Sequence, residues 1–338
     1  MKSLKTWSPG WAPGMLGLWL SLGCGAEQVP TPEPRGRVMQ QVSSCAGPSG
    51  ALCGFVTPAE AGTAGSGNSP APHVVVRPTS PSRAELIVYL PGTGSQPADI
   101  LSTAYADRDH TLYASAVSKG YRMIGLSYQN QPSVRSLCSD SDACFLATRR
   151  TLISGSVQPG SAVTSMDKAD AILPRLKALL LYLRDTVDPA GNWGSYFTQP
   201  ACTTDCVLDP AKIIVSGQSQ GGGHAGVIGR DYAVRRVVTL ASPCDAMGTN
   251  GAWASWTLPP LATAPGADRY RGLIARGQAG TQENRDACEE AAIAHWAPER
   301  MNAQWKLVIS STGLCVTDPH ECVGRDAQLY AEWLELWP

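Results

Sequence analysis

The chain has 338 residues, of which 43% are hydrophobic and only 16% are charged, a composition typical of globular proteins rather than disordered ones. With 27 basic and 28 acidic residues, the formal net charge is −1. This balance argues against a nucleic-acid-binding protein, which needs an excess of basic residues to meet phosphates. The 11 Cys are many for a cytosolic enzyme of this size and therefore indicate an oxidising compartment.

The N-terminal segment has the features of an export signal. Lys2 and Lys5 precede the apolar run Met15–Gly23, which is too short to span a bilayer as a helix. The run leads into the residues SLGC, which end at Cys24 and resemble a bacterial lipobox with its first two residues in reverse order. We predict a signal peptide over 1–23 and a lipid on Cys24 that anchors the protein to a bacterial membrane. The alternative is an ordinary secretory signal and a periplasmic or extracellular protein.

The segment 24–70 is rich in Pro, Gly, Ser, Thr and Ala and shows no helical or strand period. We therefore predict a tether there and a single globular domain over 71–338.

The cysteines other than Cys24 are even in number, as disulfides require. Proximity in sequence suggests the pairs Cys45–Cys53, Cys138–Cys144, Cys202–Cys206 and Cys315–Cys322, with Cys244–Cys288 as one longer closure. These pairs are hypotheses, because a sequence does not determine connectivity. Metal binding is the competing interpretation. It is disfavoured because the chain has no CxxC motif, so we expect no metal site.

From residue 72 onward, short apolar runs rich in β-branched residues alternate with helical stretches. Several runs are continuously apolar, as central strands covered on both faces are. The predicted strands are His73–Arg77, Glu85–Leu90, Tyr121–Tyr128, Lys212–Ser216, Arg236–Ala241, Arg271–Ala275 and Trp305–Ser310. The clearest helix is Met166–Val187, in which Pro174 marks either a kink or a later start. The alternation predicts an α/β fold with a mostly parallel central sheet and helices on both faces.

A G-x-S-x-G motif, Gly217–Gly221, directly follows one predicted strand and precedes a helical stretch. A sharp turn from strand to helix strains the serine backbone and exposes its hydroxyl at the carboxyl edge of the sheet. The motif alone is weak, because Gly and Ser are common and a small-residue turn has the same letters. Its place between a strand and a helix favours Ser219 as a nucleophile.

A serine hydroxyl needs a base, and three histidines follow Ser219 in the chain. His224 lies on the helix that starts at the motif, so we expect it to pack or to lie on the helix surface. His295 lies within another predicted helix, and we expect it to pack. His320 is predicted in a loop between the last strand and a terminal helix over 325–337, bracketed by the cysteines of one predicted disulfide. We therefore predict His320 as the base.

Residues 72–338 resemble the α/β-hydrolase superfamily in three features. These are the strand-turn-helix around the motif (known as a nucleophile elbow), a histidine near the C-terminus, and a glycine turn after an early strand. The resemblance is closest to its exported bacterial esterase-like branch with a G-x-S-Q-G-G elbow. It implies an oxyanion hole formed by the backbone N–H of Gln220 and an N–H from the turn Leu90–Gly94, there that of Thr93. An ordinary Pro-Gly turn is the alternative for that segment.

The acid of the triad is open between several carboxylates. The superfamily most often places it after the strand Arg271–Ala275, where this chain has no carboxylate near the start of the loop. Asp245 follows the preceding strand, a position that some members use. We predict Asp245 as the acid, with Glu283 as the alternative and Asp286 as a third choice. The competing interpretation of each is a solvated charge in a loop.

These residues predict a serine hydrolase, a carboxylesterase with a Ser-Asp-His triad that acts through an acyl-enzyme on a small or polymeric ester. The preference for esters rests on analogy between folds. The alternatives are a catalytically silent ligand-binding lipoprotein and a peptidase of the same fold.

No cofactor is implied, because the chain has no phosphate loop, dinucleotide fingerprint or metal cluster. We expect a monomer with no nucleic-acid partner that meets a membrane only through a lipid at Cys24. The pair Arg149-Arg150 is expected on an exposed charged face, with an acidic substrate as the alternative partner.

Overall fold

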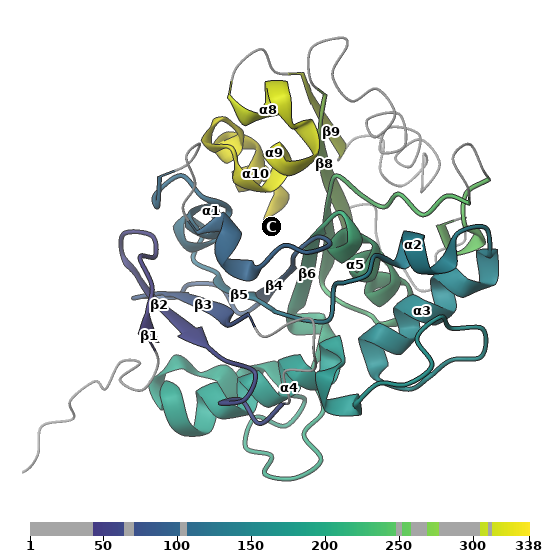
Figure 1. The fold of residues 1–338 in the computed structure, drawn as a ribbon. Helices are drawn as coiled ribbons and strands as arrows, with labels where there is room; N and C mark the ends of the chain where they lie inside the picture. The colour runs from purple at the N-terminus through teal and green to yellow at the C-terminus, as the bar shows by residue number, and fades with distance from the viewer. Residues whose placement is uncertain are drawn as a thin grey trace, which may run out of the picture. The chain divides into compact units, whose positions relative to one another are not determined.

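The computed structural model describes residues 43–63, 71–101, 107–247, 252–257, 269–276, 305–309 and 313–338. The chain divides into two units, Met1–Gly36 and Arg37–Pro338, and every described residue belongs to the second. The predicted signal peptide and Cys24 lie outside the described residues. Figure 1 shows the arrangement of the elements within the second unit.

Nine strands form one sheet in the described part of the chain, in the order β1-β2-β3-β5-β4-β6-β7-β8-β9. The pairs from β1 to β5 in this order are antiparallel, and all pairs from β5 to β9 are parallel. The predicted mostly parallel sheet is confirmed, with strand ends shifted by a few residues. The bounds are β1 Ser43–Ser44, β2 Ala51–Val56, β3 His73–Pro78, β4 Leu86–Leu90, β5 Arg122–Gly125, β6 Ile213–Gln218, β7 Arg236–Leu240, β8 Tyr270–Arg276 and β9 Trp305–Ile309.

Helices cover both faces of the sheet (Figure 1). Along β4, Leu86, Val88 and Leu90 belong to one hydrophobic cluster, whereas Ile87 and Tyr89 belong to the other, because successive strand residues point to opposite faces. The first cluster includes residues of α3 Asp142–Ser154, α4 Ile172–Tyr182 and α5 Gln220–Asp231. The second includes residues of α1 Leu112–Ser118, α9 Pro319–Arg325 and α10 Tyr330–Leu336. The predicted α/β class is therefore confirmed.

Shorter helical turns connect these elements. The other α-helices are α2 Val134–Cys138 and α8 Leu314–Thr317. The 3₁₀ turns are Pro97–Ile100, Lys168–Asp170, Pro189–Gly191, Trp193–Tyr196, Pro210–Lys212, Ser255–Thr257 and Ala327–Leu329, and a π turn spans Leu183–Val187. Within the described ranges, none of the helices has both the length and the apolar character that a transmembrane helix requires.

The predicted helix over Met166–Val187 begins later than its apolar pattern suggests. α4 starts at Ile172, so Pro174 lies in its first turn. A proline there removes no helical hydrogen bond, because the first N–H groups of a helix have no partner within it. Of the two alternatives for Pro174, the later start is confirmed.

The sheet extends into the segment that the sequence assigned to the tether. β2 pairs with β3 along its whole length, from Ala51 opposite Pro78 to Val56 opposite His73. The prediction of a tether over 24–70 was therefore wrong for β2. Composition concealed this strand, because it lies near the sheet edge, contains Gly54 and leaves most of its residues half-buried.

Four of the predicted disulfides are present: Cys45–Cys53, Cys138–Cys144, Cys202–Cys206 and Cys315–Cys322. Cys244 is disulfide-bonded as well, and its predicted partner Cys288 lies outside the described residues. Such bonds persist in oxidising compartments, which supports the prediction of export.

Candidate active site

Ser219 occupies the turn between β6 and α5 with a strained backbone. Its φ of 53° and ψ of −118° are unusual for a residue with a side chain, and such conformations cost on the order of 1–3 kcal/mol. Two bonds hold the turn: the Ser219 N–H donates to the Leu240 carbonyl at 2.9 Å, and the Ser219 carbonyl accepts from the Gly223 N–H at 3.1 Å. The strand, the strained serine and the helix therefore occur where the motif predicts them.

The glycines on either side of Ser219 are required by close packing. A Cβ at Gly217 would lie 2.3 Å from the Gly221 carbonyl carbon, and one at Gly221 would lie 2.0 Å from the Leu90 carbonyl oxygen. Both obstacles are backbone atoms, which cannot move aside as a flexible side chain can. Small residues here let β6, α5 and the end of β4 meet around the serine.

The register of the sheet brings the glycine turn after β4 next to Ser219. Leu90, the last residue of β4, pairs with Gly217 of β6. A Cβ at Gly92 would lie 3.2 Å from the Ser219 Cβ, so this turn packs directly against the serine. The turn is thus in the position that an oxyanion loop needs.

Two side chains from the segment after β5 hold this turn. The Tyr128 hydroxyl donates to the Pro91 carbonyl at 2.8 Å. The Asn130 amide donates to the carbonyls of Gly92 and Ser95, at 2.6 and 2.8 Å. Neither residue was singled out from the sequence, because each contact joins residues more than 30 positions apart.

The Gln220 side chain links the turn after β4 to α2. Its Oε1 accepts from the Thr93 hydroxyl at 3.1 Å and from the Val134 N–H at 3.0 Å. The two predicted oxyanion residues, Thr93 and Gln220, are therefore connected through their side chains. Val134 is the first residue of α2, so the same oxygen also holds that helix in place.

His320 lies on a short helix rather than in the predicted loop. It is the second residue of α9, which begins at Pro319, and the Asp318 side chain accepts from the Glu321 N–H at the start of that helix. Proline in the first turn and an acidic cap are signals of a helix N-terminus, so the sequence carried the information for this helix. The disulfide Cys315–Cys322 joins α9 to α8, as predicted for this region.

Gln218, which precedes the serine, contacts the His320 backbone. Its Nε2 donates to the His320 carbonyl at 2.9 Å, and its Oε1 accepts from the Tyr89 hydroxyl at 3.1 Å. The side chains at the two variable positions of the motif therefore face in different directions: Gln220 toward the turn after β4, and Gln218 toward His320.

One cavity of about 300 Å³ brings most of the predicted site residues together. Ser219, His320, Asp245, Thr93 and Gln220 all line it. The remaining lining residues are Gly92, Ser133, Val134, Arg135, Arg149, Cys244 and Glu321. The alternative acids Glu283 and Asp286 lie outside the described residues, as does His295.

His224 is a packing residue, which is one of the two roles predicted for it. It is fully buried and lies edge-on to the Tyr128 ring, with centroids 5.3 Å apart. Burial, assisted by the charge of Arg149, lowers the pKa of His224 well below its usual range, so the ring is neutral.

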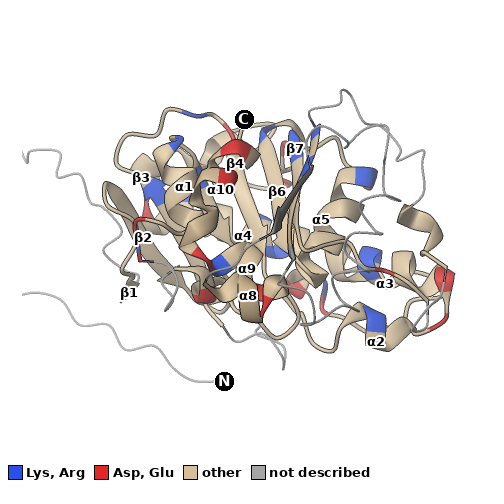
Figure 2. Ribbon diagram, turned by 90° about the horizontal axis from the view of Figure 1, so that it is seen from above, with Lys and Arg blue, Asp and Glu red and all other residues tan. Residues whose placement is uncertain are grey.

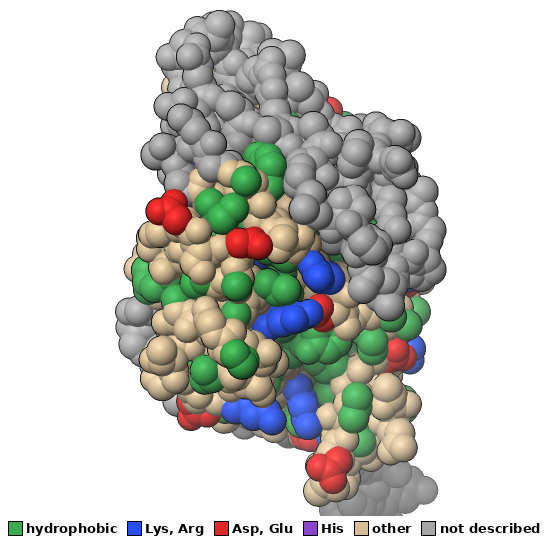
Figure 3. Space-filling model, turned by 90° about the vertical axis from the view of Figure 1, so that its right-hand side faces the viewer, with side chains coloured by type: hydrophobic (Ala, Val, Ile, Leu, Met, Phe, Trp, Pro, Cys, Tyr) green, Lys and Arg blue, Asp and Glu red, His purple; other side chains and the backbone are tan. Residues whose placement is uncertain are grey.

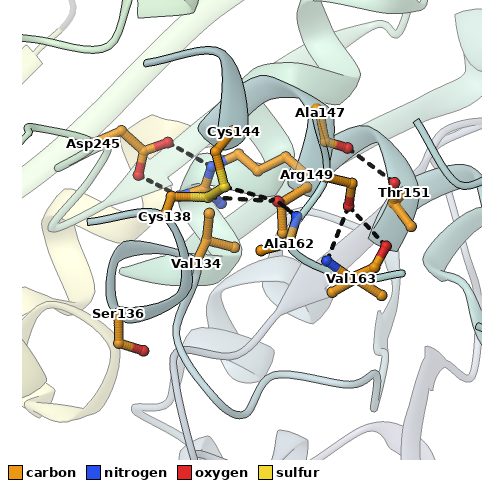
Figure 4. The surroundings of a disulfide bond; sticks show 12 residues. Val134, Ser136, Cys138, Cys144, Ala147, Arg149, Thr151, Ala162, Val163 and Asp245 are labelled. Carbon is orange, nitrogen blue, oxygen red and sulfur yellow. Dashed lines mark hydrogen bonds and ion pairs between the residues drawn. A yellow bond between two sulfur atoms is a disulfide. The ribbon is translucent and has the colours of Figure 1, made fainter. Parts of the chain in front are cut away.

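Asp245 makes a buried ion pair with Arg149. The guanidinium donates to both carboxylate oxygens, at 2.5 and 2.6 Å, and the Trp256 indole donates to one of them at 2.8 Å. Arg149 also donates to the Gln220 carbonyl at 3.0 Å, in the first turn of α5. In Figure 4 Arg149 extends from α3 past the Cys138–Cys144 disulfide to Asp245.

The expectation that both arginines of the pair 149–150 face solvent was wrong for Arg149, whose side chain is only 3% exposed. Successive residues of a helix point about 100° apart, so one can face the core while the next faces solvent. Arg150 makes a partly exposed ion pair with Asp231 at 2.7 Å. The Arg149–Asp245 contact was not foreseen because it joins residues 96 positions apart.

Charged residues of both signs line the cavity: Arg135 of α2, Arg149 of α3 with its partner Asp245, and Glu321 of α9, which pairs with Arg325 at 3.0 Å. Figure 2 shows the basic residues of the ribbon in blue and the acidic residues in red. In the space-filling view of Figure 3, basic side chains lie among hydrophobic ones on the visible face. The sulfur atoms of Cys315 and Cys322 lie close to the Asp326 carboxylate. Because the two sulfur atoms form a disulfide, they are not thiolates that could bind a metal ion.

The strand order, with a strained serine between β6 and α5 at the carboxyl ends of parallel strands, is that of the α/β-hydrolase fold. No protein-family model matches the chain, and no curated protein matches it.

Solved structures give distant likenesses. An esterase from Pyrobaculum calidifontis is 14% identical with a TM-score of 0.38, covering 84% of this chain and 85% of its own. A dienelactone hydrolase from Anabaena variabilis is 16% identical with a TM-score of 0.40, over 84% of this chain and 97% of its own. EstE1, a thermostable carboxylesterase from a metagenomic library, is 12% identical with a TM-score of 0.39, covering 88% of this chain and 92% of its own. These values are too low to carry an inference about activity.

Proposed function

We propose that the protein is a serine hydrolase that cleaves carboxylic esters through an acyl-enzyme. The Ser219 oxygen attacks the ester carbonyl while His320 accepts the hydroxyl proton, and the same proton is returned to the alcohol as it leaves. Water then attacks the acyl-enzyme with His320 as the base again, which releases the carboxylic acid and restores Ser219. The backbone N–H groups of Gln220 and Thr93 stabilise the negative oxygen of each tetrahedral intermediate.

The observation that carries this proposal is the strained Ser219 in a cavity that His320 also lines. A backbone conformation of this kind persists only where the surrounding structure enforces it, and such sites concentrate where function needs them. Here the enforcement extends to the adjacent turn, which is bonded to Asn130, Tyr128 and Gln220.

The acid of the triad is proposed as Asp245, with Glu283 as the alternative. Asp245 is supported because it lines the same cavity as His320. Glu283 is supported because Arg149 binds both oxygens of Asp245, which compensates its charge and leaves less of it to stabilise an imidazolium. The comparison of Asp245→Asn with Glu283→Gln decides between them. Loss of the acid lowers kcat by about 10⁴. Because Asp245→Asn also breaks the buried pair with Arg149 and should lower the melting temperature, kcat is compared at a temperature at which circular dichroism shows both variants to be folded.

Hydrolysis of p-nitrophenyl esters of increasing acyl length, together with aryl and sugar esters, tests the activity and the substrate class. We expect turnover that Ser219→Ala abolishes, while the matched variant Ser195→Ala, at a serine that does not line the cavity, retains it. Full turnover by Ser219→Ala would overturn the proposal. The absence of turnover on every ester would favour the silent ligand-binding alternative.

We also propose that the protein is exported and carries a lipid on Cys24. The disulfides support an oxidising location, and the SLGC sequence supports the lipid. Cys24→Ser should release the protein from the membrane fraction into the soluble fraction. A wild-type protein that is already soluble and begins after residue 24 would contradict the lipid.

A further inference from the structure

A second cavity, of about 620 Å³, lies on the face of the sheet that α3, α4 and α5 cover. Its inner wall includes Val88 and Leu90 of β4 and Val215 of β6, and Ile172 and Leu176 of α4 line it as well. It shares no lining residue with the cavity at Ser219. Its volume falls in the range of about 300–1,000 Å³ that small-molecule sites occupy.

Exposed apolar side chains gather at this cavity. Among the described residues, the large hydrophobic side chains that are most exposed are Val207 at 61%, Val157 at 48% and Tyr232 at 37%. Val207 and Tyr232 line the cavity, and Val157 directly follows the lining residue Ser156. Exposed apolar residues that cluster rather than scatter mark a surface that binds something apolar.

Among the described residues, the only charged ones that line the cavity are Lys168 and Lys177. Lys168 is exposed and Lys177 is half-buried, and neither has an ion-pair partner among the described residues. Two carboxylates next to lining residues in the sequence are paired with other cations: Asp231 with Arg150, and Asp209 with Lys212. Asp167 accepts from the Ala169 N–H and Asp205 is exposed, and among the described residues no ion pair joins either of them to Lys168 or Lys177. The lining of the cavity therefore combines an apolar interior with two positive charges.

We propose that this cavity binds a free long-chain fatty acid. The aliphatic chain would lie along the apolar walls, where its removal from water is favourable. The carboxylate would meet the ammonium groups of Lys168 and Lys177, which bind anions as point charges. A neutral apolar ligand would leave both charges unused, and a short polar anion would leave the walls uncovered. This site does not depend on the proposed ester hydrolysis.

Titration of the full chain with the fluorescent fatty acid cis-parinaric acid tests this proposal. We expect saturable binding that falls at least tenfold in the double variant Lys168→Glu/Lys177→Glu. The matched variants Lys119→Glu, at a lysine that does not line the cavity, and Arg135→Glu, at the cavity around Ser219, should bind as the wild type does. Hexadecanol has the aliphatic chain without the charge. Its dissociation constant, measured by displacement of the probe, should be the same for the wild type and the double variant.

Circular dichroism checks that the double variant is folded. If it is not, Val207→Glu adds a negative charge at an exposed position of the cavity and should weaken binding in the same direction. The absence of saturable binding, or equal affinity in wild type and charge-reversed protein, would overturn the proposal. Loss of binding in Arg135→Glu alone would also overturn it, because the acid would then occupy the cavity at Ser219.

Discussion

The two glutamines that flank Ser219 connect it to different parts of the domain. We call the residues around Gln220 the Gln220 side and those around Gln218 the Gln218 side. On the Gln220 side, one amide oxygen accepts from Thr93 and Val134, and the helix backbone is bound by a guanidinium that is itself paired with Asp245. The bonds from Val134 and from Arg149 are buried, and the bond from Thr93 is partly buried. Together they tie Ser219 and the turn after β4 to three helices of the domain, α2, α3 and α5.

On the Gln218 side, the amide meets the Tyr89 hydroxyl and the carbonyl of His320. α9, which carries His320, is only 7 residues long and is tied to α8 by Cys315–Cys322. A short helix of this kind has little stability of its own. Its position therefore depends on its packing in the second hydrophobic cluster and on these ties. We infer that damage on the Gln220 side lowers stability, whereas damage on the Gln218 side lowers the catalytic rate first.

The largest effect is expected from the ion pair on the Gln220 side. Arg149→Met leaves the Asp245 carboxylate buried without its main partner, which should lower the free energy of unfolding by about 3–5 kcal/mol. Arg150→Met, which removes a partly exposed pair, should cost no more than about 1 kcal/mol. Urea unfolding measures both. Equal losses in the two variants would contradict the buried scaffold.

Reduction of the disulfide on the Gln218 side should act on catalysis. A displacement of a catalytic group by about 1 Å can cost roughly a hundredfold in rate. Cys315→Ser/Cys322→Ser should therefore lower ester turnover about a hundredfold while far-UV circular dichroism is unchanged. Cys202→Ser/Cys206→Ser, whose residues do not line the cavity at Ser219, is the control and should keep its turnover. Unchanged turnover in the first variant would refute the role of this disulfide.

The bond between Gln218 and His320 should have a smaller effect. Gln218→Leu removes the hydrogen bond to the backbone of the helix that carries His320, worth about 0.5–1.5 kcal/mol. It also removes the bond that Gln218 accepts from the Tyr89 hydroxyl. We expect kcat to fall by up to about tenfold with KM unchanged, since the bond to His320 orients the histidine rather than the substrate. Gln199→Leu, at an exposed glutamine, should leave both constants unchanged. A change in KM alone would place Gln218 at substrate binding instead.

Acid should weaken the domain by the smallest amount. Burial lowers the pKa of His224 well below its usual value and lowers that of His73 to about 3. Each imidazole therefore takes up a proton near pH 6.5 only in the unfolded chain, so its stabilisation is complete above that pH and is lost as the pH falls toward the folded pKa.

Between pH 6.5 and 5.5 the free energy of unfolding should fall by about 1 kcal/mol for each of these histidines. His224→Phe keeps a planar ring but cannot take up a proton, so it should reduce this loss by about 1 kcal/mol, the contribution of one histidine. Urea titrations at the two pH values measure the difference. An unchanged pH dependence in this variant would show that His224 is not buried as a neutral ring.

Local signals in the sequence predicted much of this molecule. Apolar runs predicted the strands, the motif Gly217–Gly221 predicted the turn at Ser219, and proximity predicted disulfides such as Cys138–Cys144. Each of these features is encoded by residues that are close together in the chain.

What the sequence did not disclose depends on contacts between distant residues. Gln218 and His320 are 102 positions apart, and Arg149 and Asp245 are 96 apart. A pattern within one segment does not predict such a contact. The contact is stabilised by burial and by a geometry that exist only in the folded sheet. β2 was missed for a related reason, since a strand near the sheet edge keeps part of its surface in water and lacks a continuous apolar run.

The central claim is that Ser219 is a nucleophile activated by the site around it, and covalent labelling tests it most directly. A fluorophosphonate should add to the wild-type protein with a stoichiometry of about one, peptide mapping should place the adduct on Ser219, and ester turnover should fall in step with labelling. Ser219→Ala should remain unlabelled. An adduct on another serine, or undiminished labelling of Ser219→Ala, would contradict the account.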